Sequence, residues 1–250
     1  MDKGLSEQDV LVRLLNSAEA VLLDFDGPIC DLFYGKPTAP IAALIKDQAR
    51  GVWGTLTPEV EACVDSHGLL QCLRDMLEPD SHGLTRDPMP LKFAESVVRE
   101  FEVEAVQTAR PADRVQDLVD HLRGLGKSLV IVSNNAEEPV REYLDGVGLL
   151  PQIKGIFGRD PDEPRHMKPD PDCILRALAY LGLTQSPNSC LMVGDQLTDL
   201  EAARAAKTPF LGYSTALAAE MKTSGAAWAV TSHQPTIEAA QVLMASRSHN

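Results

Sequence analysis

Short apolar runs that alternate with amphipathic stretches limit the possible folds of this chain more than any other feature. The runs that follow residue 110 are SLVIVS (128–133), GIFG (155–158), CLMVG (190–194), PFLGY (209–213) and AWAVT (227–231). The stretch 115–125, just before the first of them, carries apolar residues at helical spacing. Strands that are apolar throughout and separated by helices are typical of a buried parallel sheet. We therefore predict an α/β fold, with a parallel sheet covered by helices on both faces.

A similar apolar run, AVLLDFD, occupies residues 20–26 and follows an amphipathic helix for which Ser6 is the expected cap. About eighty residues separate this predicted strand from the next strand–helix unit, and their apolar spacing is helical. We predict a core domain made of residues 1–30 and 111–250, with an all-helical domain, residues 31–110, inserted after the first strand.

Composition excludes several functional classes. Asp and Glu number 36 against 23 Lys and Arg, which gives a formal net charge of −13 and a pI near 4.8. This charge disfavours nucleic acid and anionic membranes as partners. The cysteines are odd in number and form no CxxC pair, which disfavours a disulfide framework and a zinc site. With no secretory signal and no apolar run of about 20 residues, we expect a soluble cytoplasmic protein.

Two carboxylates end the first predicted strand. Side chains at i and i+2 of a strand point the same way, so Asp24 and Asp26 are expected together at its carboxyl end, where α/β sheets bind ligands. Two adjacent anions repel each other. A divalent cation relieves that repulsion, and so does a raised pKa that lets one group act as an acid.

A second acidic pair follows the strand at 190–194, where GDQLTD supplies Asp195 and Asp199. Thr198 and Glu201 have the spacing of a capping box, so a helix is expected to begin there, and Asp195 precedes that cap. Mg²⁺ prefers oxygen ligands and keeps several waters. Carboxylates from two strands, with a backbone carbonyl, would form an open Mg²⁺ site.

Groups that could bind an anion are also present. Ser133 ends the strand at 128–133, where its hydroxyl and nearby backbone N–H groups could bind a phosphate oxygen. Lys168 stands just before Asp170-Pro171, the expected start of a helix, and could neutralise both a phosphate and an aspartate. Each also has an ordinary interpretation, as a polar turn and as a surface lysine.

Taken together and in order, four motifs resemble the haloacid dehalogenase superfamily, specifically its phosphatase-like members with a helical cap, such as phosphoglycolate phosphatase and β-phosphoglucomutase-like proteins. The motifs are DFDG (24–27), SNN (133–135), KPDP (168–171) and GDQLTD (194–199). The resemblance covers roughly residues 18–30 and 110–232 and implies a Rossmann-like core. The helical insert matches the position of that family's cap but carries no substrate signature.

The resemblance implies a role for each acidic residue. Asp24 would be the nucleophile, and Asp26 would protonate the leaving group and later activate water. Asp195 would hold Mg²⁺ with Asp24 and the main-chain carbonyl of Asp26. Asp199 would be a further ligand or a partner of the ligands.

The resemblance also implies a phosphate-binding set, namely Gly27, Ser133, Asn134 and Lys168. Lys168 would in addition orient Asp24 and offset charge. The expected activity is a Mg²⁺-dependent hydrolase that cleaves a small phosphomonoester through an aspartyl-phosphate.

One residue departs from the family pattern. Gly27 is followed by Pro28 where the family usually has threonine, so a hydrogen bond made by that residue or its amide is altered. The geometry and rate of the site are affected, but no catalytic carboxylate is removed.

Two alternatives remain open. A phosphomutase would pass the same phosphoryl group to a second hydroxyl of a sugar phosphate, and the core motifs do not separate it from a hydrolase. A non-catalytic phosphate-sensing module has similar residue types, although a receiver domain is about half this length. The expected partner is a small phosphorylated metabolite, and the choice between a monomer and a homodimer also stays open.

Overall fold

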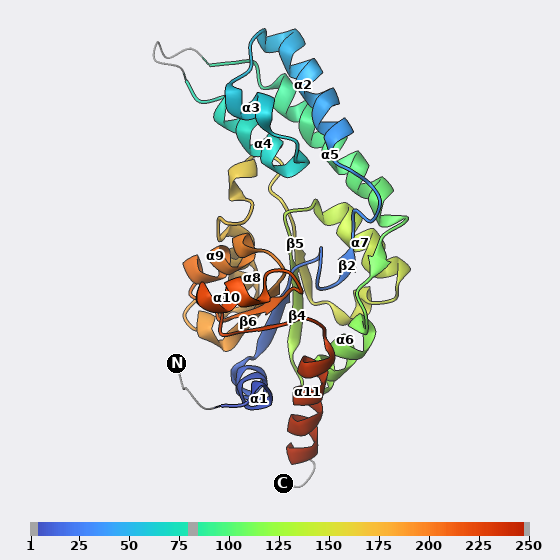
Figure 1. Ribbon diagram of the computed structural model, residues 1–250, viewed down its shortest axis with the longest axis vertical. Helices are drawn as coiled ribbons and strands as arrows, with labels where there is room; N and C mark the ends of the chain where they lie inside the picture. The colour runs from blue at the N-terminus through green and yellow to red at the C-terminus, as the bar shows by residue number, and fades with distance from the viewer. Residues whose placement is uncertain (1–4, 80–84, 248–250) are drawn as a thin grey trace.

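The computed structural model describes residues 5–79 and 85–247, which form two parts stacked along the long axis of the molecule (Figure 1). The lower part holds the sheet and both ends of the chain. The upper part contains helices from the first half of the sequence. The predicted α/β architecture with a helical insert is confirmed.

The sheet has six parallel strands in the order β5-β4-β1-β6-β7-β8. Its central strand is β1, which pairs with β4 on one side and β6 on the other. The strands are β1 (Ala20–Leu23), β4 (Ser128–Val132), β5 (Gly155–Phe157), β6 (Cys190–Gly194), β7 (Phe210–Tyr213) and β8 (Trp228–Val230). All of them fall within the apolar runs that predicted them.

Each face of the sheet is covered by its own hydrophobic cluster, because successive strand residues point to opposite faces. Val21 and Leu23 of β1 belong to the cluster under α1, α6, α7 and α11. Ala20 and Leu22 belong to the cluster under α8, α9 and α10. Burial on both faces explains why the strands read as unbroken apolar runs rather than as an alternation.

The helices of the lower part lie mostly between strands. They are α1 (Glu7–Ser17), α6 (Val115–Gly124), α7 (Glu137–Gly146), α8 (Asp172–Leu181), α9 (Leu197–Ala205), α10 (Ala218–Thr223) and α11 (Gln234–Arg247). The described residues of this part also form three short 3₁₀ helices, each between a helix and a strand: η1 (Leu150–Gln152), η2 (Pro164–His166) and η3 (Pro187–Ser189). As predicted, Ser6 caps α1, and its hydroxyl accepts a hydrogen bond from the Asp9 amide.

The upper part, which we call the cap, is helical and has a separate hydrophobic cluster. Its helices are α2 (Ala39–Trp53), α3 (Pro58–Ala62), α4 (Ser66–Asp75) and α5 (Met89–Val106). Ile45, Leu70 and Val98 are among the buried residues of this cluster. Met167, from the lower part, packs into the same cluster, so the two parts share apolar contacts.

A two-stranded ribbon joins the two parts. β2 (Cys30–Asp31) pairs antiparallel with β3 (Arg110–Pro111), where the chain leaves and re-enters the lower part. No sequence pattern indicated this ribbon, because two-residue strands carry no periodicity. The end of α5 continues below the cap, since Ala105 and Val106 pack in the cluster under α1. The division at residues 30 and 110 stays a prediction.

Two local predictions were wrong. The first strand ends at Leu23 rather than at Asp26, because the chain turns there and the Ile29 and Cys30 amides both donate to the Phe25 carbonyl. Asp24 and Asp26 therefore do not share one face of a strand. The capping box of α9 is formed by Gln196 and Asp199, not by Thr198 and Glu201. Among the described residues, no helix has the length and hydropathy needed to cross a bilayer.

Candidate active site

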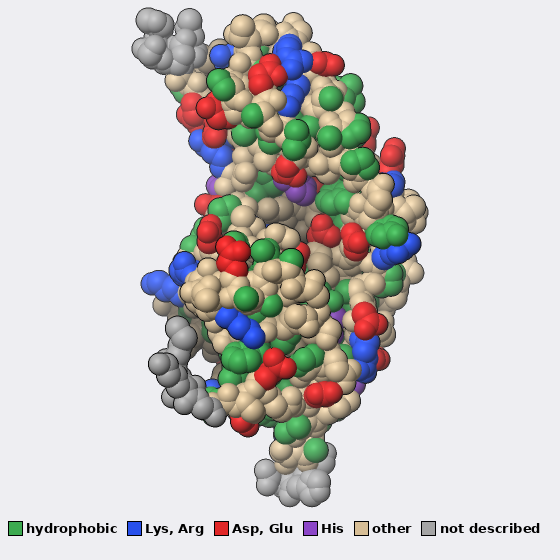
Figure 2. Space-filling view, viewed as in Figure 1, with side chains coloured by type: hydrophobic (Ala, Val, Ile, Leu, Met, Phe, Trp, Pro, Cys, Tyr) green, Lys and Arg blue, Asp and Glu red, His purple; other side chains and the backbone are tan. Residues whose placement is uncertain are grey.

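A cavity of about 250 Å³ lies at the carboxyl ends of β1, β4 and β6, under the cap. The space-filling view shows this face of the molecule hollowed between the cap and the lower part (Figure 2). The cavity is lined by Asp24, Asp26, Ser133, Asn134, Lys168, Asp195 and Asp199 from the sequence motifs. The structure thus brings together seven of the eight predicted site residues from segments far apart in the chain, and Gly27 lies directly beside Asp195.

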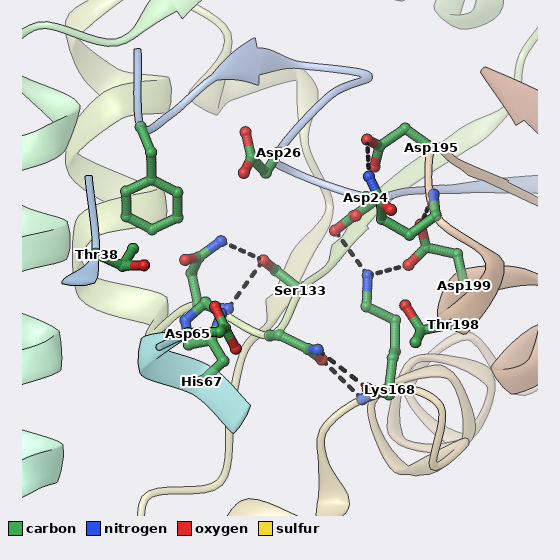
Figure 3. Close-up of a pocket in the computed structure, with 14 residues that line it drawn as sticks. Asp24, Asp26, Thr38, Asp65, His67, Ser133, Lys168, Asp195, Thr198 and Asp199 are labelled. Atoms are coloured by element: carbon green, nitrogen blue, oxygen red, sulfur yellow. Dashed lines mark hydrogen bonds and ion pairs between the residues drawn. The ribbon is translucent and has the colours of Figure 1, made fainter. Parts of the chain in front are cut away.

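Lys168 is the central cation among these residues (Figure 3). Its Nζ lies 2.8 Å from Asp24 Oδ1 and 2.6 Å from Asp199 Oδ1. Burial alone would lower the pKa of this lysine, but the charges of Asp199 and Asp24 raise it above the usual range. Lys168 is therefore a buried positive charge held between Asp24 and Asp199.

Asp24, Asp195 and Asp199 form a compact carboxylate cluster. One oxygen from each lies within 4.8 Å of the others. Burial, then repulsion from Asp199, raises the pKa of Asp24 above its usual range and that of Asp195 to about 6. Three carboxylates against a single lysine leave an excess of negative charge. Oxygen donors in this arrangement fit a hard divalent cation, which would relieve the repulsion.

The loop after β1 positions the first acidic motif. Asp24 Oδ1 accepts a hydrogen bond of 2.7 Å from the Phe25 amide, which fixes the carboxylate next to its own backbone. Gly27 has a φ of 95°, and a Cβ built there would lie 2.6 Å from Asp195 Cγ. Glycine is required at this position both by the left-handed backbone and by the close approach of Asp195. We expect any phosphate contact of Gly27 to be through its backbone.

Asp26 lies apart from the carboxylate cluster. Its Oδ1 accepts a hydrogen bond of 2.9 Å from the Leu32 amide. Burial raises the pKa of Asp26, while the Leu32 bond opposes that shift. A carboxyl that holds its proton above the ordinary pKa and lines the cavity is suited to act as a general acid. Its side chain is not one of the clustered oxygen donors.

The loop after β4 builds a ring of hydrogen bonds around Ser133. The Ser133 hydroxyl accepts hydrogen bonds of 3.1 Å from both the backbone N–H and the side-chain amide of Asn135. The side chain of Asn134 holds the backbone of Lys168 through bonds of 2.8 and 3.2 Å. Asn134 thus ties the second motif to the third, while still lining the cavity.

Other residues that line the cavity were not predicted. Asn135 closes the ring around Ser133, and its Oδ1 is buried without a hydrogen-bond partner among the described residues. The SNN motif could have indicated it. Asp65 and His67 enter from α4 of the cap, on the opposite side of the cavity from Asp195 (Figure 3). No sequence signal indicated these two, because they belong to a helix whose apolar spacing reports only its buried face.

Comparison with known proteins agrees with this geometry. The family model described as haloacid dehalogenase-like hydrolase matches residues 18–207. A phosphoglycolate phosphatase from Thiobacillus denitrificans is 26% identical over 196 residues, which are 76% of this chain and 81% of the relative. The N-acetylmuramic acid 6-phosphate phosphatase of Pseudomonas aeruginosa is 25% identical over 198 residues, 76% of this chain and 79% of the relative.

The fold is also shared with solved structures. A haloacid dehalogenase-like family protein from Streptococcus pneumoniae superposes with a TM-score of 0.58 at 18% identity, over 92% of this chain and 99% of that one. The family match covers all four motifs and the cap, and the fold, the carboxylate cluster and the buried lysine agree with it. The chain therefore belongs to the haloacid dehalogenase-like hydrolases and, within them, is similar to the phosphatases.

Proposed function

We propose that the protein is a Mg²⁺-dependent hydrolase that releases inorganic phosphate from a small phosphomonoester through an aspartyl-phosphate on Asp24. The observation that carries this proposal is the position of Lys168, buried between Asp24 and Asp199 at the floor of the cavity. An exposed lysine would be screened by water, whereas the Lys168 side chain is only 3% exposed. A buried one neutralises a carboxylate so that it can accept an anionic substrate.

The metal would be held by Asp24, Asp195 and Asp199, with the main-chain carbonyl of Asp26 as a further donor. When bound, Mg²⁺ supplies charge neutralisation for the phosphoryl oxygens and for the clustered carboxylates. Ser133, positioned by Asn135, would donate its hydroxyl hydrogen to a phosphoryl oxygen.

In the first step, a carboxylate oxygen of Asp24 attacks phosphorus, and the bond from phosphorus to the ester oxygen breaks. Asp26 gives its proton to that leaving oxygen, so an alcohol departs. In the second step, Asp26 takes a proton from water as the water oxygen attacks phosphorus. The bond to Asp24 breaks, phosphate leaves, and both carboxyl groups return to their starting states.

Relatives suggest the first substrates. Phosphoglycolate and N-acetylmuramic acid 6-phosphate are named in the matched phosphatases, and both pair a phosphate ester with a carboxylate. The cavity of about 250 Å³ suits a small phosphorylated metabolite. We propose such a metabolite as the partner, and neither nucleic acid nor a membrane.

The test is phosphate release from a panel of small phosphomonoesters, with Mg²⁺ and with EDTA. We expect release only with the metal, and a loss on the order of a thousandfold or more in Asp24→Asn. Asp145→Asn, an exposed change on α7, is the matched control and should keep full activity. An Asp24→Asn variant that turns over normally would overturn the mechanism. An isomeric phosphate formed without phosphate release would identify a mutase.

Asp26→Asn tests the second role. With p-nitrophenyl phosphate, whose leaving group needs no proton, we expect a burst of one p-nitrophenolate per enzyme followed by slow turnover, because water is no longer activated. With an alkyl phosphate, we expect turnover to fall by about 10²–10⁴ without a burst. Equal losses on both substrates, with no burst, would argue against the acid–base role.

A further inference from the structure

A chain of buried polar contacts connects the cap to the phosphate-binding loop. His67 Nε2 lies 2.8 Å from Glu102 Oε1, and the other oxygen of Glu102 accepts a hydrogen bond of 3.1 Å from the Ala136 amide. Arg159 Nη1 lies 2.7 Å from Glu102 Oε1 and donates at 2.8 Å to the Asn134 carbonyl. The side chains of Glu102 and Arg159 are fully buried. These contacts thus fix the position of His67 relative to the loop that carries Ser133.

The orientation of the His67 ring follows from these contacts. Because Nε2–H donates to Glu102, the free ring atom is Nδ1, which has no hydrogen-bond partner in the described part of the chain. The side chain is 18% exposed and lines the cavity. A histidine that served only to satisfy Glu102 would not need to reach the cavity.

Charge makes His67 distinct among the residues around the substrate. Lys168 is already paired with two carboxylates at the floor of the cavity. Arg159 is likewise paired with two carboxylates, those of Glu95 and Glu102. Across the cavity from the carboxylate cluster, His67 therefore offers an unpaired ring nitrogen to an oxygen of the substrate.

We propose that His67 is the residue that recognises the leaving group, by a hydrogen bond from or to Nδ1, and that the preferred substrates carry a hydroxyl or carboxylate on the alcohol esterified to phosphate. Glu102 is the positioning residue for this imidazole, and Arg159 fixes Glu102 relative to the phosphate-binding loop. The inference rests on the proposed function and deepens it, because it assigns the specificity of the same cavity to a residue of the cap.

Two substitutions separate substrate recognition from a structural role. His67→Gln places an amide where Nε2 was and keeps the contact with Glu102, but it removes the group at the Nδ1 position. His67→Asn places an amide where Nδ1 was, but it removes the contact with Glu102. A purely structural histidine would tolerate glutamine better than asparagine, whereas a recognition residue would tolerate asparagine better.

The test substrates are three phosphate esters that differ only in the group carried by the alcohol part. They are phosphoglycolate, with a carboxylate, 2-hydroxyethyl phosphate, with a hydroxyl, and ethyl phosphate, with neither. For the native protein we expect kcat/KM to be at least about tenfold higher for the carboxylate or the hydroxyl compound than for ethyl phosphate. In His67→Gln that ratio should fall to within about threefold, because kcat/KM for the carboxylate and hydroxyl compounds falls toward the value for ethyl phosphate. His67→Asn should keep part of the preference.

Substitution of Glu102 provides an independent test. Glu102→Gln should reduce the same substrate preference without a matching loss on ethyl phosphate, because the imidazole loses its fixed orientation. Glu100→Gln, an exposed change on the same helix, is the control and should leave the preference intact. If Glu102→Gln does not fold, the two His67 variants still decide the question.

Failure of the inference about His67 and failure of the proposed phosphatase function would give different results. A native protein without substrate preference, or a folded His67→Gln variant that keeps it, would overturn the inference even though phosphate release continues. If no ester is hydrolysed, binding is measured by calorimetry with 3-phosphonopropanoate, 3-hydroxypropylphosphonate and propylphosphonate in Mg²⁺. A preference for an oxygenated phosphonate that His67→Gln abolishes supports the inference, and equal binding of all three refutes it.

Discussion

Gly27 and Gly194 let two carboxylates approach the backbone more closely than any side chain would allow. A Cβ at Gly194 would lie 2.5 Å from Asp199 Oδ2, and one at Gly27 would lie 2.6 Å from Asp195 Cγ. At the scale of single residues, the carboxylate cluster therefore depends on two absent side chains as well as on the acidic ones. The DFDG and GDQLTD motifs each contain one of these glycines.

Gly27→Ala should separate metal-dependent activity from folding. The left-handed backbone costs alanine about 1–2 kcal/mol, and the new methyl group must push Asp195 out of the cluster. We expect phosphate release to fall by roughly tenfold or more at a fixed Mg²⁺ concentration, and to recover partly at higher Mg²⁺. Gly51→Ala, in the open interior of α2, should have native activity and a stability equal to or above the native value, measured by urea unfolding.

At the scale of elements, α4 has two functions on two faces. Leu69, Leu70 and Leu73 pack into the cap cluster, while Asp65 and His67 at its N-terminal end line the cavity. Asp65 also caps the helix, because its side chain accepts a hydrogen bond from the Gly68 amide. The packing of one face thus sets the position of the residues on the other.

Leu70→Ala tests this dependence. The fully buried side chain leaves a cavity, so we expect the free energy of unfolding to fall by about 2–5 kcal/mol. Substrate KM should also rise, because α4 no longer holds its N-terminal end in place. Leu44→Ala, at a half-exposed position of the same cap, should change stability by about 0.5 kcal/mol or less. Urea unfolding of both variants gives the comparison, and equal losses would refute the packing argument.

At the scale of the whole molecule, the cap is attached to the lower part on two sides. On one side, Arg159 pairs with Glu95 and Glu102 of α5. On the other, Arg74 of α4 lies 2.9 Å from Glu163, at the start of η2. With the β2–β3 ribbon, these contacts fix the cap over the cavity in the observed arrangement.

Glu163→Gln should reveal, through its pH dependence, the combined ion pairs of Glu163 with Arg165 and Arg74. The Arg165 side chain, and after it Arg74, lowers the pKa of Glu163 to about 2. A folded-state pKa below the ordinary value of 4.5 contributes stability above pH 4.5, and that stability is lost as pH falls toward 2.

These ion pairs are near the surface, so we expect the native protein to exceed Glu163→Gln by about 1 kcal/mol or less at pH 7 and by less at pH 3. Urea unfolding at the two pH values measures the difference. A difference that grows on acidification would contradict the assignment.

Local sequence patterns predicted the six strands of the main sheet, most helices and the motif residues, because each depends on neighbours within about one turn or one strand. The capping box of α9 shows where such patterns fail. Thr198 with Glu201 is the stronger local signal, because threonine is a preferred N-cap residue and glutamine is not. Asp199 forms the capping box because its carboxylate is also buried against Lys168, which lies 31 positions earlier in the chain. Only the folded structure contains that contact.

The sequence by itself determined the α/β architecture and the strand ends where Asp24, Ser133 and Asp195 stand, because hydrophobic periodicity and motif order are properties of the linear chain. Tertiary structure alone decided the cap side of the site. His67 and Glu102 are 35 residues apart, and Glu102 and Arg159 are 57 apart. Such a contact forms only when the packing of α4, α5 and the lower part removes the side chains of Glu102 and Arg159 from water and leaves each of these two charges needing a partner.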